Sequence, residues 1–386
     1  MSTFFKQSKW IILAGALFGC LGAIAVNLGN PSNMGICVAC FMRDIAGGLK
    51  LQNAAIVQYL RPEIMGFVFG AFISALAFKE WKPRGGSSPI LRFIIGIFVM
   101  FGALVYLGCP VRMMLRMSGG DLSAFIALAG LVSGILVGVF FLKRGFSLGR
   151  AGEVSKVAAS IMPNVMLVLL AFLAIAPSFI AFSESGPGSL HVNWVIGLAL
   201  GAIVGFAVQR TRFCSIGGWR DIFLAKDFYL FSGLIAFIVA ALLTNIICGN
   251  FGEGGLVTTI GARTVDVAYK VGIHGQPIAL PYADVEGSTS FFGTAVAQYI
   301  FSYLAFVVVG LGCTMLGGCP LRNLILSAEG DTDAGIAVFG MIIGGALAHN
   351  FGIASSAASM GANGGFAVLI ALAFLIVLGF VAREKA

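Results

Sequence analysis

The sequence predicts an all-α polytopic membrane protein with about ten spans (9–10), short re-entrant half-helices and an inverted internal repeat. Of its 386 residues, 59% are hydrophobic and only 10% are charged, and the mean hydropathy is +1.00. A soluble domain carries about 25% charged residues, so the composition excludes a soluble protein, a disordered chain and a nucleic-acid-binding domain. The net charge of +8 requires no nucleic-acid partner, because Lys and Arg gather in the cytoplasmic loops of polytopic proteins.

Ten apolar runs approach the length of about 20 residues that crosses a lipid bilayer as a helix. We expect helices throughout, since an open strand edge is not tolerated in lipid. The runs cover residues 10–28, 64–78, 91–108, 122–142, 161–182, 192–208, 228–247, 291–311, 334–347 and 366–381.

Basic residues in the short loops predict the orientation. They form five clusters: Lys6 and Lys9; Lys79, Lys82, Arg84 and Arg92; Lys143, Arg144, Arg150 and Lys156; Arg210, Arg212, Arg220 and Lys226; Arg383 and Lys385. With ten spans, all five fall on the side of the N-terminus. Loop 183–192 has no Lys or Arg, and loop 249–290 has four acids against Arg263 and Lys270. The positive-inside rule therefore places both termini in the cytoplasm.

Two motifs recur in the same order. Cys37-x5-Arg43-Asp44 returns 177 positions later as Cys214-x5-Arg220-Asp221, and Gly108-Cys109-Pro110-x-Arg112 returns 210 positions later as Gly318-Cys319-Pro320-x-Arg322. The second offset is longer than the first because loop 249–290 lies between the two motifs of the second half. Inverted repeats with sites on broken helices are typical of transporters.

These matches divide the chain into four parts. Residues 1–145 form the first repeat half with spans one to four, and residues 146–190 hold the linking fifth span. Residues 191–350 form the second half with spans six to nine and the insertion 249–290. Residues 351–386 hold the tenth span. An odd span between two four-span units inverts the second unit relative to the first.

Each motif interrupts an apolar run and predicts a half-helix. Residues 30–35 (Asn-Pro-Ser-Asn-Met-Gly) are typical of a helix start. The following residues 36–49 are too short to span, so we expect a re-entrant half-helix with Cys37 in its first turn. The Pro that follows Cys109 and Cys319 suits the first helical position. Each thiol would then lie at a helix N-terminus, which attracts anions.

Four arginines follow these cysteines within a few residues: Arg43, Arg112, Arg220 and Arg322. A charge at membrane depth is costly and by default marks a functional site. The alternative is that the arginines only lock the half-helices through ion pairs. Arg322, for example, could pair with Asp331 or a neighbour.

The cysteines outside the repeated positions are interpreted differently. Cys20 and Cys248 have no repeat partner, and we expect them to be small packing residues. Cys40 and Cys313 are left open between packing and function. The Cys37-x2-Cys40 spacing fits a redox or metal site, but no second pair or nearby His completes a zinc site.

Thiols, arginines and helix N-termini together favour a small anion that contains sulfur or selenium. Phosphate would not need thiols, and a metal cation would be repelled by the arginines. The main hypothesis is therefore a permease rather than an enzyme, with no ATP site and no cofactor. One rival is a membrane thiol–disulfide oxidoreductase that acts on Cys37 and Cys40. Another is a non-selective channel, which the arginines disfavour.

The motifs also resemble the YeeE/YedE family of membrane proteins. The resemblance rests on residues 30–47, on Gly108-Cys109-Pro-Val-Arg112, and on Gly318-Cys319-Pro-Leu-Arg322 followed by residues 329–334, and it extends over nearly the whole chain. It is nearest to the YedE branch, associated with selenium metabolism, whose sister branch takes up thiosulfate.

This resemblance implies an hourglass-shaped channel in the bacterial inner membrane. Cysteines along a central path would pass the anion by transient S–H···S contacts. The path cysteines would be Cys37, Cys109 and Cys319, with Cys214 as the repeat mate of Cys37, whereas Gly217 stands opposite Cys40. The resemblance also suggests that a cytosolic sulfur- or selenium-carrier protein docks at the inner face.

Overall fold

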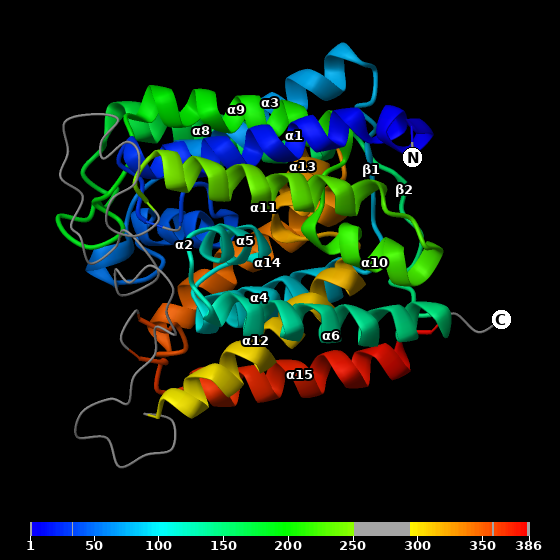
Figure 1. Ribbon diagram of the computed structural model, residues 1–386. Helices are drawn as coiled ribbons and strands as arrows, with labels where there is room; N and C mark the ends of the chain where they lie inside the picture. The colour runs from blue at the N-terminus through cyan, green and yellow to red at the C-terminus, as the bar shows by residue number, and fades with distance from the viewer. Residues whose placement is uncertain (1, 33, 251–293, 357–358, 384–386) are drawn as a thin grey trace.

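The computed structural model describes residues 2–32, 34–250, 294–356 and 359–383, with side chains from residue 8 onward. The chain folds as an all-α membrane protein (Figure 1). Its helices are α1 Ser2–Asn27, α2 Val38–Gly48, a 3₁₀ turn Ala55–Val57, α3 Pro62–Ala77, α4 Pro89–Tyr106, α5 Pro110–Ser118, α6 Ser123–Lys143, α7 Lys156–Ala159, α8 Ile161–Ile175, α9 Trp194–Thr211, α10 Ser215–Ala225, α11 Tyr229–Ile247, α12 Ala295–Leu316, α13 Pro320–Ala328, α14 Thr332–Asn350 and α15 Gly364–Val381. Two short strands, β1 Arg84–Gly85 and β2 Gly152–Glu153, pair antiparallel.

Within the described residues, nine helical segments are long and apolar enough to cross a membrane. This count agrees with the expected nine or ten spans. Each of the ten predicted apolar runs contains a helix, but the fifth, predicted over 161–182, is only the 15-residue α8. At about 1.5 Å per residue, α8 is about 22 Å long and too short for a hydrocarbon core of about 30 Å. It ends because Ala176 is left-handed (φ 47°) and Pro177 follows, a combination that cannot continue a helix.

The inserted loop predicted at 249–290 lies outside the described residues from position 251 onward, as does the start of the run predicted at 291–311. The loop's Arg263 and Lys270, and the terminal Lys385, lie outside them too.

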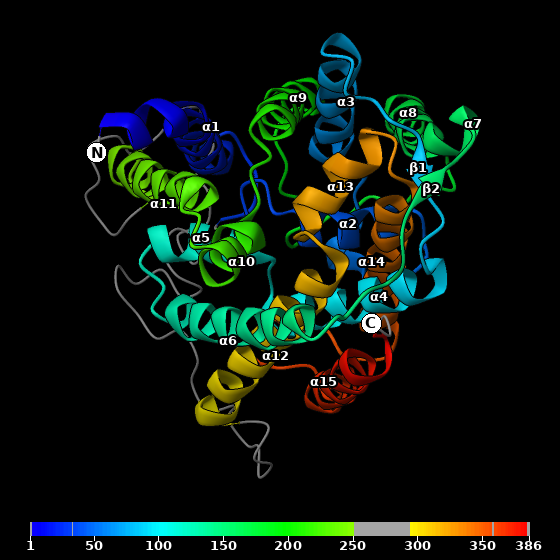
Figure 2. The ribbon, with the colours of Figure 1, turned by 90° about the vertical axis from the view of Figure 1, so that its right-hand side faces the viewer.

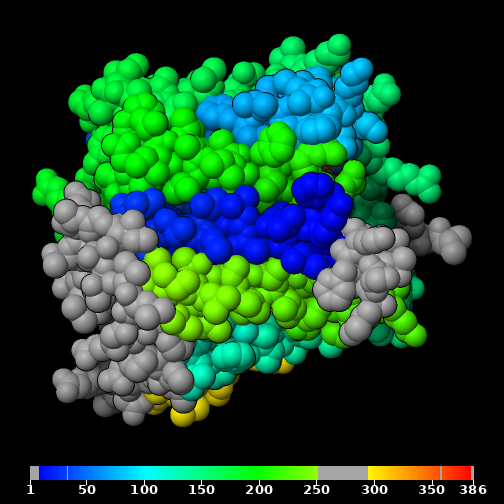
Figure 3. All heavy atoms as spheres, turned by 45° about the horizontal axis from the view of Figure 1, so that its top comes forward, coloured from blue at the N-terminus to red at the C-terminus, as the bar shows by residue number. Residues whose placement is uncertain are grey.

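The long helices pack in pairs that correspond between the two halves. Helix α1 packs on α11, as α9 packs on α3, and α6 packs on α12, as α14 packs on α4. Helices α4 and α12 also pack on each other. Suppose that α1, α3, α4 and α6 are matched in order to α9, α11, α12 and α14. The α1–α11 pair then corresponds to the α9–α3 pair, and the α6–α12 pair corresponds to the α14–α4 pair. Figure 3 shows α1 running along the surface between α9 and α11.

Glycines allow these helix pairs to approach closely. A Cβ at Gly70 of α3 would collide with the backbone of Ala202, and a Cβ at Gly201 of α9 would collide with the backbone of Glu63. The α6–α12 pair has the same feature at Gly134, which lies against Val307. Small residues at helix contacts are the usual means of tight packing in membranes.

The basic loops gather at one end of the helix bundle. The strand pair β1–β2 joins loop 78–88 to loop 144–155, and Arg210 pairs with Glu80 at 3.0 Å. The amide of Ser147 donates to the carbonyl of Ala382 at 3.1 Å, which brings the end of α15 to the same place. Figure 1 shows the start of α1 and the end of α15 at this end, beside β1, β2 and α10.

The short helices that follow the motif cysteines lie inside the bundle. Figure 2, which looks along the long helices, shows α2 and α13 among them. Every residue of α2 is buried, as are eight of the nine residues of α5 and eight of the nine of α13. Helix α10 is more open, with four of its eleven residues buried. The fold therefore holds four broken-helix starts at its centre.

Candidate functional site

The four motif cysteines are the N-cap residues of the four half-helices: Cys37 of α2, Cys109 of α5, Cys214 of α10 and Cys319 of α13. Three of the thiols accept a hydrogen bond from the backbone N–H three residues later, at 3.3–3.4 Å: Cys37 from Cys40, Cys214 from Gly217 and Cys319 from Arg322. This satisfies one of the donors left unpaired at a helix start. The cysteines thus lie where the sequence predicted a helix N-terminus.

The half-helix expected over residues 36–49 is α2, Val38–Gly48. Cys37 is its N-cap rather than a residue of its first turn, and Asn30 does not cap it. The Asn30 side chain instead donates to the Gly35 carbonyl and to Glu63, each at 2.7 Å, and accepts from the Val192 amide at 3.0 Å. It ties the loop before Cys37 to α3 and to the start of α9, because a side-chain amide can satisfy several separate backbone groups.

The Gly-Cys-Pro-x-Arg motif has a local structural explanation. Cys109 is the cap and Pro110 fills the first helical position, where a missing N–H costs nothing. The side chain of Arg112 folds back over Gly108, where a Cβ would lie 2.7 Å from the Arg112 Cδ. The second copy repeats this arrangement, since a Cβ at Gly318 would lie 3.0 Å from the Arg322 Cβ and Cγ. The glycine therefore makes room for the arginine beside the thiol.

Three thiols and one guanidinium meet in the first half. The Cys37 and Cys109 sulfurs are 3.6 Å apart, and the Arg112 Nη1 donates to the Cys40 sulfur at 3.4 Å. All three cysteines are at most 1% exposed. We call Cys37, Cys40, Cys109 and Arg112 the first-half cluster. Cys40, which the sequence left open, is thus part of it.

The charge of Arg112 has no carboxylate partner among the residues that the structure describes. The residue is only 9% exposed, its Nε is buried without a hydrogen-bond partner, and it forms no salt bridge within the described residues. An unpaired buried charge costs several kcal/mol. The first-half cluster therefore carries a buried positive charge beside three sulfur atoms.

The second-half cluster comprises Cys214, Cys319 and Arg322. The Cys214 and Cys319 thiols interact with each other. Arg322, unlike Arg112, forms a buried ion pair, with its Nη1 2.9 Å from the Glu329 Oε1. Asp331, the other partner considered from the sequence, pairs instead with Arg84 at 2.8 Å.

The remaining predicted arginines are held by aspartates. Arg43 pairs with Asp44 at 2.7 Å and Arg220 with Asp221 at 2.8 Å. Asp44 also accepts from Arg61 at 2.7 Å. In these two residues the geometry matches the structural alternative, in which the ion pair locks the half-helix.

Sequence reasoning missed two buried arginines that fix the half-helices. Arg61 links Asp44 to the carbonyls of Pro187 and Leu190 in the loop before α9. Arg116 pairs with Asp121 at 2.6 Å and donates to the Tyr106 carbonyl at the end of α4. The available clue in the sequence was the acidic Asp121 five positions after Arg116, inside an otherwise apolar stretch.

The other cysteines lie apart from the two clusters or between them. Cys20 accepts from the Thr244 hydroxyl at 3.3 Å, and Cys248 follows the end of α11. Cys313, in α12, is fully buried and interacts electrostatically with both Cys109 and Cys214. It is therefore the one cysteine within reach of both clusters in the described part of the chain.

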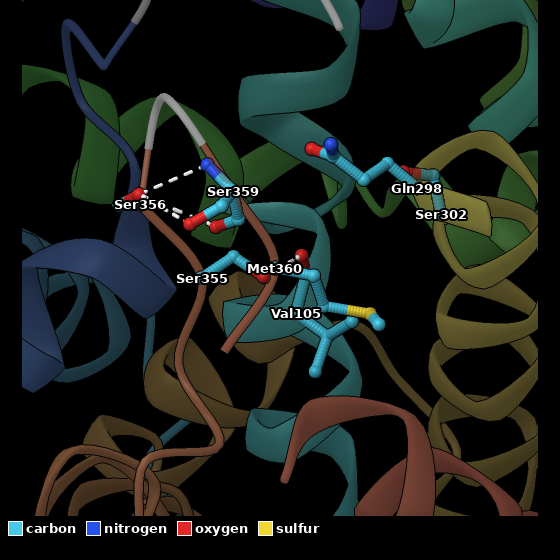
Figure 4. Close-up of a pocket in the computed structure, with 7 residues that line it drawn as sticks. All are labelled: Val105, Gln298, Ser302, Ser355, Ser356, Ser359 and Met360. Carbon is cyan, nitrogen blue, oxygen red and sulfur yellow. Dashed lines mark hydrogen bonds between the residues drawn. The ribbon is translucent and has the colours of Figure 1, made fainter. Parts of the chain in front are cut away.

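Two cavities in the described residues lie outside the clusters. A cavity of about 10 Å³, enough for about one water, is lined by Val105, Gln298, Ser302, Ser355, Ser356, Ser359 and Met360 (Figure 4). An apolar cavity of about 250 Å³ lies between α7, α8, α13 and α14. Neither is lined by a predicted site residue.

The fold and these clusters define a multi-pass, all-α membrane protein with buried thiols and arginines at broken-helix starts. No known protein-family profile matches the chain. The chain is similar to the thiosulfate transporter TsuA of Escherichia coli (strain K12), with 29% identity over 143 residues. This similarity covers 37% of the chain and 30% of the length of TsuA.

Proposed function

We propose that this protein is a membrane transporter for a small sulfur-containing oxyanion, with thiosulfate as the first candidate. The single observation that carries the proposal is Arg112, a buried guanidinium that has no carboxylate partner in the described part of the chain, touches one thiol and lies beside two more. The similarity to TsuA supports transport and favours thiosulfate over the selenium passenger that the family resemblance implied.

The chemistry of the first-half cluster suits such an anion. A desolvated anion loses its hydration, and a buried guanidinium can replace it with a planar fork of donors that matches two oxygens. Charge-assisted hydrogen bonds contribute about 1.5–3 kcal/mol each. The terminal sulfur of thiosulfate can accept from the S–H groups of Cys37, Cys40 or Cys109, and this soft sulfur suits a thiol-lined site better than the more strongly hydrated oxygens of sulfate.

The path of the anion follows from the two clusters. We infer an inverted repeat, because the helix pairs exchange between the halves, and an hourglass-like path with one cluster on each side. Cys313 is the intermediate thiol. The passenger would move from Cys37 and Cys109 past Cys313 to Cys214 and Cys319, and the thiols would remain reduced throughout.

Uptake into proteoliposomes tests this function directly. We expect uptake of labelled thiosulfate, competition by unlabelled thiosulfate, and little competition by sulfate; selenite and selenosulfate serve as further competitors. Arg112→Ala should lower uptake at least about tenfold, since it removes at least one charge-assisted hydrogen bond. Arg144→Ala is the matched control, because that arginine is exposed and stacks on Phe140. Wild-type protein that takes up no thiosulfate, or an Arg112→Ala protein with normal uptake, would refute the proposal.

The oxidoreductase rival has its own test. A thiol oxidase acting on Cys37 and Cys40 should pass electrons to a quinone and cycle through a disulfide. Quinone-dependent thiol oxidation by the purified protein, without thiosulfate uptake, would favour that rival. The proposed transporter should show uptake and no such oxidation.

A further inference from the structure

The two clusters differ in charge although their motifs match. Arg112 and Arg322 occupy the same position, three residues after the capping cysteine, and both are at most 9% exposed. Within the described ranges, Arg322 alone of the two has a carboxylate partner, Glu329, with 2.9 Å between the Arg322 Nη1 and the Glu329 Oε1. The first-half cluster is therefore cationic and the second-half cluster is internally neutralised.

This difference in charge comes from one sequence position. The second-half motif lies 210 positions after the first, so Glu329 corresponds to Gly119. Each of these residues follows the last residue of its half-helix as the C-cap, with ordinary right-handed backbone angles. A carboxylate is thus present at the end of α13 and absent at the end of α5.

Glu329 is held where it can reach Arg322. Its carbonyl accepts from the Lys82 amide at 2.9 Å, and the next turn is tied to the α3–α4 loop through the Arg84–Asp331 ion pair. The Arg322 guanidinium has no other hydrogen-bond partner among the described side chains. The carboxylate therefore occupies the place on Arg322 that the passenger anion would take.

We propose that Glu329 is a built-in counter-anion that competes with the transported anion for Arg322. This inference rests on the proposed function. The anion binds firmly at Arg112, where nothing competes, and only weakly at Arg322, where it must displace Glu329. Such a difference holds the passenger at the first-half cluster and lets it leave quickly from the second-half cluster. When no anion is there, Arg322 remains paired with Glu329.

The test measures thermal stability of the purified protein with and without thiosulfate, because a ligand that binds the native state raises Tm. In Glu329→Gln, Arg322 loses its partner, and breaking a buried pair on one side is destabilising. We expect a lower Tm without anion and a larger rise on adding thiosulfate than in the wild-type protein. Glu329→Asp keeps the charge and should remain near the wild-type behaviour.

The double variant Glu329→Gln with Arg322→Gln separates competition from a purely structural role. It removes both charges, so it should recover Tm in the absence of anion and lose the extra rise with thiosulfate. Binding titrations should show a second thiosulfate event in Glu329→Gln alone. The uptake rate of Glu329→Gln should fall at least about tenfold because the anion is retained at Arg322. This change is equivalent to ~1.4 kcal/mol.

The reverse exchange supplies the matched variant. Gly119→Glu places a carboxylate near Arg112, and thiosulfate binding should weaken at least about tenfold. A Glu329→Gln protein whose Tm rises with thiosulfate by no more than the wild-type rise would overturn the inference, even where the wild-type protein transports normally. Wild-type protein that neither binds nor transports thiosulfate would instead refute the proposed function.

Discussion

At the residue scale, each letter of the Gly-Cys-Pro-x-Arg motif has a physical role. The glycine leaves room for the arginine side chain, the cysteine caps the half-helix, and the proline fills a position that needs no N–H donor. The arginine lies in the first turn, where a second positive element, the helix N-terminus, is already present. Five residues thus bring a thiol and a cation into one small volume.

The glycine supports a first prediction. A Cβ at Gly108 would lie 2.7 Å from the Arg112 Cδ, so Gly108→Ala should push the flexible guanidinium away and leave the fold intact. Thiosulfate uptake should fall about tenfold with little change in Tm. Gly318→Ala is the comparison, because its Cβ meets Arg322 at 3.0 Å and should affect uptake less. Equal uptake in Gly108→Ala and wild-type protein would contradict the assigned role of Arg112.

The thiols support a second prediction. Cys109→Ala removes the sulfur that lies 3.6 Å from the Cys37 sulfur and should abolish uptake while the protein stays folded. Cys319→Ala should do the same through the second-half cluster. Cys20→Ala is the control, since Cys20 belongs to neither cluster and its sulfur accepts from the Thr244 hydroxyl of α11. The measurement is the uptake rate per folded molecule. Near-normal rates in both Cys109→Ala and Cys319→Ala would exclude a thiol-lined path.

At the element scale, the fold depends on four glycine-rich helix contacts. Helices gain little hydrophobic free energy by associating in lipid, so close backbone packing has to stabilise the pairs. The α3–α9 contact illustrates this, because Gly66 and Gly70 face α9 while Gly201 and Gly205 face α3. The same elements carry the half-helices, so a change in helix spacing also moves the cysteines.

A third prediction tests this packing. Gly201→Val would place its side chain against the backbone of Glu63, and overpacking of this kind costs about 1–3 kcal/mol. We expect a lower Tm and less folded protein in detergent. Gly152→Ala is the control, because a Cβ there meets no atom within 4 Å. A Gly201→Val protein as stable as the control would mean that the α3–α9 contact can separate without loss.

The spans and half-helices could be predicted from sequence because both are local signals. Hydrophobic length fixes the spans, and the Cys-Pro step fixes the start of α5 and α13. The ion pairs could not be predicted, since they depend on which carboxylate the fold brings to each arginine. Glu329 lies seven positions after Arg322, and Arg61 reaches Asp44 only after the chain turns back. The role of Asn30 could not be predicted either, since its partners Glu63 and Val192 reach it only through the fold.

At the scale of the whole molecule, the two clusters are attached to opposite ends of the bundle. The loop before Cys37 is tied through Asn30 to Val192, in the segment without basic residues. The α13 end carries Glu329, whose carbonyl accepts from the Lys82 amide in a basic loop. The Lys143 ammonium donates to the Phe223 carbonyl in α10. Helix α10, like α13, is therefore attached to a basic loop.

This arrangement supports the last prediction, on sidedness. If the basic end faces the cytoplasm, Cys37 and Cys109 should react from the periplasm and Cys214 and Cys319 from the cytoplasm. Each cysteine is measured as the single remaining thiol, with a small membrane-impermeant reagent applied to intact cells or to inverted vesicles. The thiols are buried, so labelling should be slow. A variant whose single thiol is Cys248, which follows α11, is the reference outside the clusters. Labelling of Cys319 but not Cys109 from outside the cell would reverse the orientation, and labelling of all four from one side would rule out an inverted repeat.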